Sequence, residues 1–370
     1  SAFAQILGKV GATAPTVKDA AEFKKVFNAV QALISEGKIQ AGHDVGSGGL
    51  ITTLLEMCFA DNELAAEVDL TALAEEDLLK VLFAENVAVV FQADQSIEDD
   101  LKAQGVRYAK IGTVTQGEEL ILTHQGQTYR FNIAECRDVW YLTSYLLDKQ
   151  QTANDKATER YQNYSEQPLQ YTFPAHFTGE KPVRPQGKRP VAAVIREKGS
   201  NSEREMANAL YLAGFDVKDV HTTDLTSGRE TLEEVQFIGA VGGFSNSDVL
   251  GSAKGWAGAL LYNEKAKKAL DNFFARPDTL SVGICNGCQL FMELELINPE
   301  HSEHGKMKHN DSHKHETGFV SVTIPENNSV MLSTLAGTTL GVWISHGEGK
   351  FYLPMEEKDY NIVGKYTYEG

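Results

Sequence analysis

The sequence predicts an α+β domain at the start of the chain and a doubly wound α/β domain at its end. After Val191, short apolar runs rich in β-branched residues alternate with segments of helical period, which is typical of a parallel sheet covered by helices. Before Gln150, helical segments are mixed with a hairpin pattern. A polar stretch with neither period separates the two parts, and a chain of 370 residues suffices for two or three domains.

The first predicted domain spans residues 1–148. Residues 1–41 carry an apolar stripe at helical spacing that Gly37 closes, so this stretch is expected to be helical. The periods that follow predict helices over 51–62, 75–83, 97–105 and 133–147, strands over 87–92 and 108–114, and a hairpin of 119–123 with 127–131.

A glycine-rich turn, AGHDVGSGGL over residues 41–50, precedes the helix that begins near Ile51. The backbone amides of Gly48 and Gly49 are exposed at the positive end of that helix, where an anion such as a phosphate could bind. Asp44 could hold a divalent cation for this phosphate. Because glycine-rich turns often only start a helix, a purely structural role remains the alternative.

The segment of residues 149–190 is predicted to be a linker. It is rich in Gln, Asn, Lys, Glu and Pro. Its five aromatic residues indicate that it lies on a protein surface; they are Tyr161, Tyr164, Tyr171, Phe173 and Phe177.

The second predicted domain spans residues 191–370. Strands are expected over 191–195, 216–220, 237–241, 279–284, 319–324 and 339–345, and helices over 203–213, 229–235 and 286–296. In such folds ligands bind at the carboxyl ends of the parallel strands. Cys285 and the glycine pair Gly242 and Gly243 both follow such an end directly.

Cys285 is the candidate nucleophile because a strand, a sharp turn and a helix meet at this residue. Gly283 and Gly287 suit a tight turn, and the positive end of the helix favours a thiolate. A small buried cysteine is the alternative. The CxxC spacing with Cys288 also permits a redox pair, although Gly287 and Gln289 favour a single nucleophile. The remaining cysteines, Cys58 and Cys136, are too few for a disulfide framework.

An oxyanion hole is predicted from two backbone amides, one from Gly243 or Phe244 and one from Asn286. A glycine turn that only leaves the strand is the alternative. A polar loop over 298–316 holds five histidines, whose irregular spacing favours a solvated loop over a metal site; they are His301, His304, His309, His313 and His315.

Charge and hydropathy restrict the partners. The net charge of −17 argues against nucleic acid as a partner. No apolar run approaches membrane length and Ser1–Phe3 does not begin a signal peptide, so we expect no membrane partner and a cytoplasmic location.

Three motifs, GICNGCQL, GGFSNSDVLGSAKGWAG and SHGEGKF, together resemble the glutaminase domain of the formylglycinamide ribonucleotide amidotransferase family, also called phosphoribosylformylglycinamidine synthase, in its large single-chain form. HDVGSGGL is similar to the HDxSDGGL stretch of the family's synthetase portion. The resemblance covers essentially the whole chain. It implies a flavodoxin-like doubly wound class I glutaminase domain, preceded by the C-terminal half of an α+β domain like aminoimidazole ribonucleotide synthetase.

The resemblance also implies an activity. The family uses ATP and glutamine to convert formylglycinamide ribonucleotide to formylglycinamidine ribonucleotide in purine biosynthesis. Cys285 would form a thioester, while Gln289, His346 and Glu348 would line the glutamine site. ATP and Mg²⁺ would serve the full-length enzyme, the glutaminase half reaction would need no cofactor, and the partners would be glutamine and the remaining N-terminal synthetase domains.

The sequence departs from the family pattern at three places. The PHPE motif that supplies the family's histidine and glutamate does not occur before Gly370, so we expect a fragment that begins within a helix and is truncated at its C-terminus. His346 and Glu348 share the HxE spacing but belong by resemblance to another motif. Asn246 and Ser247 stand where the family often has Tyr and Gly, and Ser47 replaces an acidic residue, which weakens the metal role of Asp44.

Two other functions stay open: a glutaminase-like regulatory or scaffold fragment without catalysis, and a cysteine hydrolase of the same fold. We also expect little glutaminase turnover from the chain by itself, and an unusually apolar surface on residues 1–148.

Overall fold

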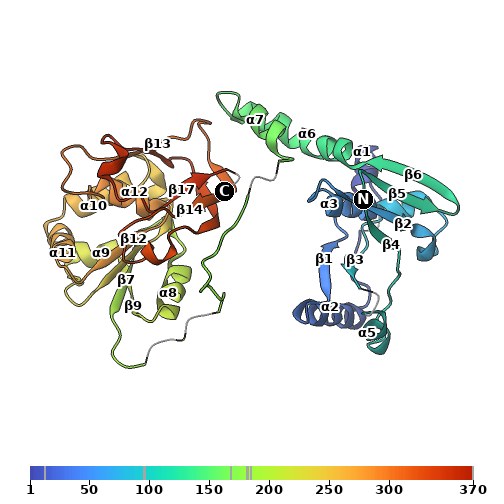
Figure 1. Ribbon diagram of the computed structural model, residues 1–370, viewed down its shortest axis with the longest axis horizontal. Coiled ribbons are helices and arrows are strands. Elements are labelled where there is room, and N and C mark those ends of the chain that lie inside the picture. Colours follow the sequence, from blue (N-terminus) through green and yellow to red (C-terminus); the bar gives the residue numbers. More distant parts are fainter. Residues whose placement is uncertain (12–13, 95–96, 167–168, 181–182, 184–185, 369–370) are drawn as a thin grey trace. The chain divides into compact units, whose positions relative to one another are not determined.

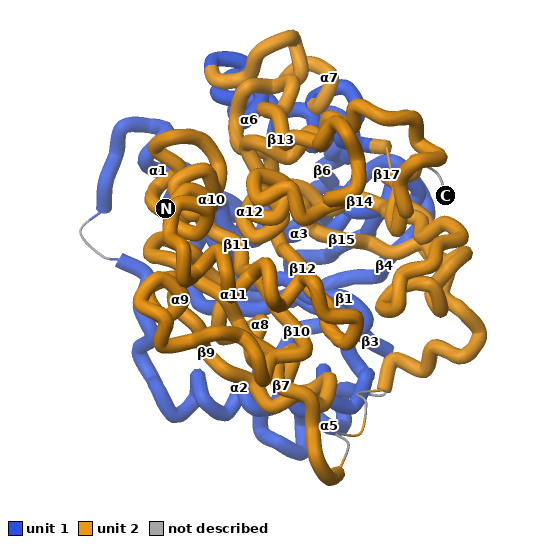
Figure 2. The backbone as a smooth tube through the Cα atoms, turned by 90° about the vertical axis from the view of Figure 1, so that its left-hand side faces the viewer, with its two compact units in different colours: residues 1–150, 161–165 blue, residues 151–160, 166–370 orange. Residues whose placement is uncertain are grey.

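The computed structural model describes the chain from residue 1 to residue 370 except 12–13, 95–96, 167–168, 181–182, 184–185 and 369–370 (Figure 1). The chain forms two compact units (Figure 2). Unit 1 comprises residues 1–150 and 161–165, and unit 2 comprises residues 151–160 and 166–370.

Unit 1 contains two sheets. The larger has the strand order β4-β2-β5-β6, with β2 parallel to β5 and antiparallel to β4, and β5 and β6 form the predicted hairpin. Its strands are β2 (Leu64–Asp69), β4 (Gly112–Gln116), β5 (Glu119–His124) and β6 (Gln127–Asn132). The smaller sheet pairs β1 (Ile39–Asp44) with β3 (Val89–Ala93) in antiparallel fashion.

The helices of unit 1 pack on these sheets around two cores. They are α1 (Ala2–Ile6), α2 (Ala20–Ser35), α3 (Gly49–Cys58), η1 (Leu70–Leu73), α4 (Leu78–Phe83), α5 (Ile97–Ala103) and α6 (Ile133–Gln151). The larger core joins α3 to β2 and β5 through Leu54, Leu120 and Leu122. The smaller one packs Leu33 of α2 against Leu101 of α5.

The prediction that residues 1–41 are helical is wrong in part. Within the described residues of this stretch, the helices are α1 and α2, and β1 already begins at Ile39. Asp19 starts α2 afresh, because its carboxylate accepts bonds from the amides of Ala21 and Glu22 at 2.9 and 3.0 Å. The predicted strand 108–114 is also displaced, since β4 begins at Gly112.

The segment predicted to be a linker contains a helix, α7 (Lys156–Asn163). Further along, Thr172 forms an isolated bridge to Thr339, with backbone bonds of 3.1 and 2.9 Å. The ring of Tyr171 lies 6.4 Å from that of Phe319. This part of the segment therefore lies on a protein surface, as its aromatic residues predict.

Unit 2 is built on a parallel sheet of four strands in the order β12-β10-β7-β9, as the alternating pattern predicts. The strands are β7 (Val191–Arg196), β9 (Asp216–His221), β10 (Phe237–Ala240) and β12 (Leu280–Gly283). The helices around it are α8 (Glu203–Leu212), α9 (Thr222–Ser227), α10 (Lys254–Leu261), α11 (Glu264–Phe274) and α12 (Asn286–Glu293).

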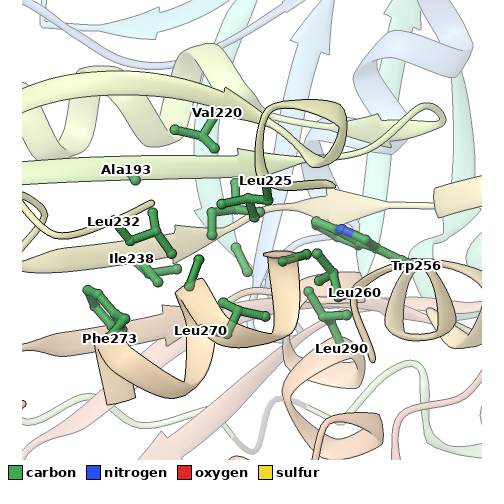
Figure 3. Packing of buried hydrophobic residues seen from close by; sticks show 14 of the residues in the cluster. Ala193, Val220, Leu225, Leu232, Ile238, Trp256, Leu260, Leu270, Phe273 and Leu290 are labelled. Atoms are coloured by element: carbon green, nitrogen blue, oxygen red, sulfur yellow. The ribbon is translucent and has the colours of Figure 1, made fainter. Parts of the chain in front are cut away.

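The sheet is covered on both faces because the side chains of its strands alternate. Ala192 and Val194 of β7 pack in one core with Leu210 of α8. Ala193 and Ile195 pack in the other, which also holds Trp256, Leu260, Phe273 and Leu290 from α10, α11 and α12 (Figure 3). The fully buried Trp256 is among the largest side chains in this second core.

The predicted helix over 229–235 is wrong; the helix here is α9, one segment earlier. The carboxylate of Asp224 and the ring of His221 form a capping box at its start, and Gly228 ends it at φ 79°. Leu232 and Val235 are buried in an irregular stretch that mimics a helical period. The Arg276 guanidinium donates to the carbonyls of Leu232, Glu233 and Val235, which replaces the bonds that a helix would supply.

Three smaller sheets complete unit 2. One is an antiparallel sheet of three strands in the order β15-β14-β17. The other two are two-stranded sheets, in which β13 pairs with β16 and β8 pairs with β11. These elements are β8 (Ser200–Asn201), β11 (Gly242–Gly243), β13 (Lys306–Lys308), β14 (Glu316–Thr323), β15 (Thr339–His346), β16 (Lys350–Tyr352) and β17 (Lys365–Thr367), with the short helices η2 (Ser245–Asp248), η3 (Ser333–Leu335) and η4 (Glu357–Asp359). In the described part of the chain, every helix is too short or too polar to traverse a bilayer.

Candidate active site

Cys285 occupies the sharp turn between β12 and α12. Its backbone has φ 53° and ψ −113°, a conformation that a residue with a Cβ adopts only under strain, and α12 begins at the next residue. The cysteine is exposed. The structure thus displays the thiol at a turn instead of burying it among apolar side chains.

Three glycines allow the chain to approach itself closely around this turn. A Cβ on Gly287 would lie 2.1 Å from the carbonyl oxygen of Ala240, and one on Gly283 would lie 2.5 Å from that of Gly287. A Cβ on Gly242 would lie 3.1 Å from the Cβ of Cys285. Side chains at the first two positions would therefore push α12 away from the sheet.

The Cys285 sulfur lies near the end of β15. It is 3.5 Å from the carbonyl oxygen of Ser345. The hydroxyl of Ser345 in turn lies 2.9 Å from Nε2 of His315. The ring of His315 is 5.9 Å from that of Phe244. Strand β15 therefore borders the thiol, and β11 lies beside it as well, because a Cβ on Gly242 would lie 3.7 Å from the Cys285 sulfur.

His346 follows Ser345 but bonds elsewhere. Its Nδ1 lies 2.9 Å from Oδ1 of Asn310, whose Nδ2 donates to the His346 carbonyl at 2.7 Å. Burial, followed by the charge of His315, lowers the pKa of His346. Among the described residues, no hydrogen bond joins a histidine nitrogen to the Cys285 sulfur.

The backbone amides around Cys285 differ in their availability. The amides of Cys288 and Gln289 bond back to the Cys285 carbonyl at 2.9 and 3.1 Å, whereas that of Asn286 has no acceptor within the described parts of the chain. The amide of Phe244 donates to Gly199 at 2.9 Å, so it is already used. Bonds alternate along an antiparallel pair, so the amide of Gly243 faces away from β8.

A buried polar network supports the start of α12. Asn286 is fully buried; its Oδ1 accepts from the amide of Ser245 at 3.1 Å, and its Nδ2 donates to Oε1 of Gln289 at 2.9 Å. The Gln289 Nε2 donates to the carbonyl of Glu348 at 2.8 Å. The structure thus joins Gln289 to the backbone of Glu348, and the amide group of Gln289 is already bonded within the protein.

Sequence reasoning missed Asp248, Ser252 and Asn310. Oδ1 of Asp248 accepts from Nδ2 of Asn286 at 3.3 Å, and the amide of Ser252 donates to the Glu348 carboxylate at 3.4 Å. Asn310 holds the turn after β15 through His346. Asp248 and Ser252 lie within the motif GGFSNSDVLGSAKGWAG, which could have pointed to them, whereas Asn310 lies within a stretch that reads as solvated loop.

The histidine-rich stretch is only partly the solvated loop that we predict. The side chains of His301 and His304 are 11% and 24% exposed, and His301 packs edge-on against Tyr360 at 5.1 Å. β13 also lies within this stretch. The parts of the chain that the structure describes contain no convergent group of three metal-ligating side chains.

In unit 1, the amides of the glycine-rich turn are already bonded. The Gly48 amide donates to the Glu85 carboxylate at 3.1 Å, and the Gly49 amide donates to the carbonyl of Gly46 at 3.1 Å. Bonds from the amides of Ala2 and Gly48 lower the pKa of Glu85. The carboxylate of Glu85 therefore takes the place that the sequence assigns to a phosphate. The side chain of Asp44 is 82% exposed.

Two family models match separate regions of the chain. Residues 189–367 match the family of CobB/CobQ-like glutamine amidotransferase domains, and residues 2–125 match the C-terminal domain of AIR synthase related proteins. The chain is 38% identical to a probable phosphoribosylformylglycinamidine synthase, chloroplastic/mitochondrial, of Arabidopsis thaliana, over 96% of this chain and 26% of the relative. The chain thus spans about a quarter of that relative's length.

Two solved structures show weaker likenesses. One, PurLQS from Thermotoga maritima, is 26% identical, with a TM-score of 0.40 over 48% of this chain and 75% of that chain. The other, T. maritima PurL complexed with ATP, is 16% identical, with a TM-score of 0.27 over 30% of this chain and 21% of that chain. The chain thus carries regions that match these two domain families, and it is similar to the plant phosphoribosylformylglycinamidine synthase over about a quarter of that protein's length.

Proposed function

We propose that this chain supplies the glutaminase part of a phosphoribosylformylglycinamidine synthase. It would release ammonia from glutamine for the ATP-dependent conversion of formylglycinamide ribonucleotide to formylglycinamidine ribonucleotide. The observation that carries this proposal is the exposed thiol of Cys285, held in a strained turn in front of α12. A glutaminase needs a nucleophile and an oxyanion site together, and this turn offers both.

The Cys285 sulfur attacks the side-chain amide carbon of glutamine, and the carbonyl oxygen becomes an oxyanion. The unused amide of Asn286 donates to this oxyanion, together with the amide of Gly243. The proton released by the thiol passes to the amide nitrogen, the carbon–nitrogen bond breaks, and ammonia leaves. Water then hydrolyses the thioester, which gives glutamate and restores the thiol. The network of Asn286, Gln289 and Glu348 fixes the turn, so we assign Gln289 and Glu348 to positioning the glutamine site and not to catalysis.

The described residues provide no base on the sulfur, so the chain by itself should turn over glutamine slowly. The expected result is weak glutamate release that His346→Ala leaves unchanged, because Nδ1 of His346 is committed to Asn310. Robust release that His346→Ala abolishes would instead make His346 the base. His176→Ala, which removes an exposed histidine outside the site, serves as the matched control.

The synthetase activity belongs to a longer protein, and its substrates and partners are part of this proposal. The residues of unit 1 do not by themselves fit a phosphate with its metal, because Glu85 takes the Gly48 amide and Asp44 lies out in solvent. The cytoplasmic location stays a prediction, while the name of the plant relative places that protein in chloroplasts or mitochondria.

A glutamine analogue with an electrophilic diazoketone in place of the amide tests the proposal directly. It should add once, to Cys285, and Cys285→Ser should abolish the adduct while Cys136→Ser leaves it unchanged. An adduct at another residue, or no adduct at all, would show that Cys285 is not the nucleophile. Hydrolysis of dipeptides but not of glutamine would favour a cysteine hydrolase.

A further inference from the structure

The backbone of the nucleophile turn brings a second thiol close to the first. Cys285 precedes α12 and Cys288 lies in its first turn, and the Cys288 amide donates to the Cys285 carbonyl at 2.9 Å. A turn closed by such a bond keeps its end Cα atoms within about 7 Å. Disulfides span Cα distances of roughly 4.4 to 6.8 Å, so a bridge can form without moving the helix far.

The two thiols have different surroundings. Cys285 is exposed, whereas Cys288 is half-buried, and burial followed by the charge of Cys285 raises the pKa of the Cys288 thiol. An oxidant in solution therefore reaches Cys285 first. Cys288 stays a protonated thiol, which is less reactive toward an oxidant than a thiolate.

We propose that Cys288 is a resolving cysteine, which closes a reversible disulfide with Cys285 after the nucleophile has been oxidised by a peroxide. In the first step the Cys285 thiolate attacks one peroxide oxygen; a sulfur–oxygen bond forms, the oxygen–oxygen bond breaks, and hydroxide leaves. In the second, the sulfur of Cys288 attacks the sulfenic sulfur; a disulfide forms, and hydroxide leaves with the Cys288 proton as water. The peroxide is reduced by two electrons and the thiol pair is oxidised by two.

The bridge has two consequences for the nucleophile. It stops Cys285 from attacking an amide, and it keeps the sulfur from further oxidation to sulfinic or sulfonic acid, which thiols do not reverse. The first consequence rests on the proposed glutaminase function, but the bridge itself does not. The structure thus assigns to the CxxC spacing a protective role in addition to the nucleophile.

The test treats the full chain with hydrogen peroxide and maps its peptides by mass spectrometry. The peptide of residues 285–288 should lose the mass of two hydrogen atoms and regain it with dithiothreitol. Cys288→Ser and Cys288→Ala should instead accumulate sulfinic acid on Cys285 by about tenfold more than the wild type. Cys136→Ser should behave as the wild type, and circular dichroism confirms that each variant is folded.

Two readouts separate this proposal from the glutaminase function. Reduced protein that fails to react with the glutamine analogue contradicts the function alone. Wild-type protein that accumulates sulfinic acid as fast as Cys288→Ser, with no cross-linked peptide, contradicts the resolving role alone. If both hold, peroxide should block the analogue's adduct and dithiothreitol should restore it.

Discussion

At the scale of single residues, Cys285 sits in a backbone conformation that disfavours any side chain. Such a conformation costs on the order of 1–3 kcal/mol. The close contacts at Gly242, Gly283 and Gly287 hold the turn in this conformation despite its cost. The protein therefore tolerates the strain at the residue that exposes the thiol. This is the pattern expected of a site selected for chemistry over stability.

The first prediction is that Cys285→Gly stabilises the protein. Glycine adopts positive φ without a Cβ penalty, so the variant should unfold at a free energy about 1 kcal/mol higher than wild type. Cys285→Ala keeps the Cβ and is the matched control, with little gain expected. Equal stability of the two variants in urea titrations would show that the turn is not strained.

The second prediction concerns pH and His346. Burial lowers the pKa of this histidine in the folded chain below its ordinary 6.5. As pH falls through that value, the unfolded chain binds a proton that the folded chain resists, so the contribution of this residue to stability is lost toward acid. His346→Gln should reduce the loss of unfolding free energy between about pH 7.5 and 5.5, a range that brackets the ordinary histidine pKa of about 6.5. An identical loss in the variant would contradict this.

At the scale of elements, α12 is placed by its approach to β10. A Cβ at Gly287 would clash with the Ala240 carbonyl at 2.1 Å. Gly287→Ala should therefore destabilise unit 2 by about 1–3 kcal/mol and slow labelling of Cys285. Gly258 lies in α10, where an added Cβ would meet only the ring of Tyr262 at 3.9 Å. Gly258→Ala is the control and should be neutral or mildly stabilising.

Arg276 offers a fourth prediction. Its guanidinium bonds three carbonyls of the irregular stretch after α9. Arg276→Met should leave these carbonyls unsatisfied and cost about 1–3 kcal/mol in thermal or urea unfolding. Arg204, exposed on α8, gives the control Arg204→Met, for which a change within about 0.5 kcal/mol is expected. A loss of stability no greater than that of the control would show that Arg276 does not stabilise this irregular stretch.

The elements that the sequence predicts well are those whose period and position agree. In the parallel strands, and at the turn that holds Cys285, the hydrophobic period of the sequence agrees with the position of the element. The apolar runs there end at the residues where the strands end. The stretch over 229–235 carries a helical period, yet its backbone is bonded by Arg276, which lies far away in sequence. The site is partly hidden for the same reason: Asn310, Asp248 and Ser252 act through contacts that no local pattern encodes.

At the scale of the whole molecule, each unit has its own cores and can be understood by itself. Unit 1 exposes large apolar residues along α6, where Val139, Leu146 and Leu147 are 69%, 53% and 62% exposed. The plant relative is about four times as long as the region that this chain matches, since the match covers 26% of it. An exposed apolar helix face is a feature expected of a protein with further domains to contact.

The proposed function requires that the Cys285 sulfur faces a site that binds glutamine. The rate at which the diazoketone analogue labels Cys285, with and without an excess of glutamine, tests this requirement. Glutamine should slow labelling at Cys285 in proportion to its occupancy of the site, and glutamate at the same concentration should slow it less. Labelling that ignores glutamine, or that falls on Cys288 or Cys136 instead, would contradict it.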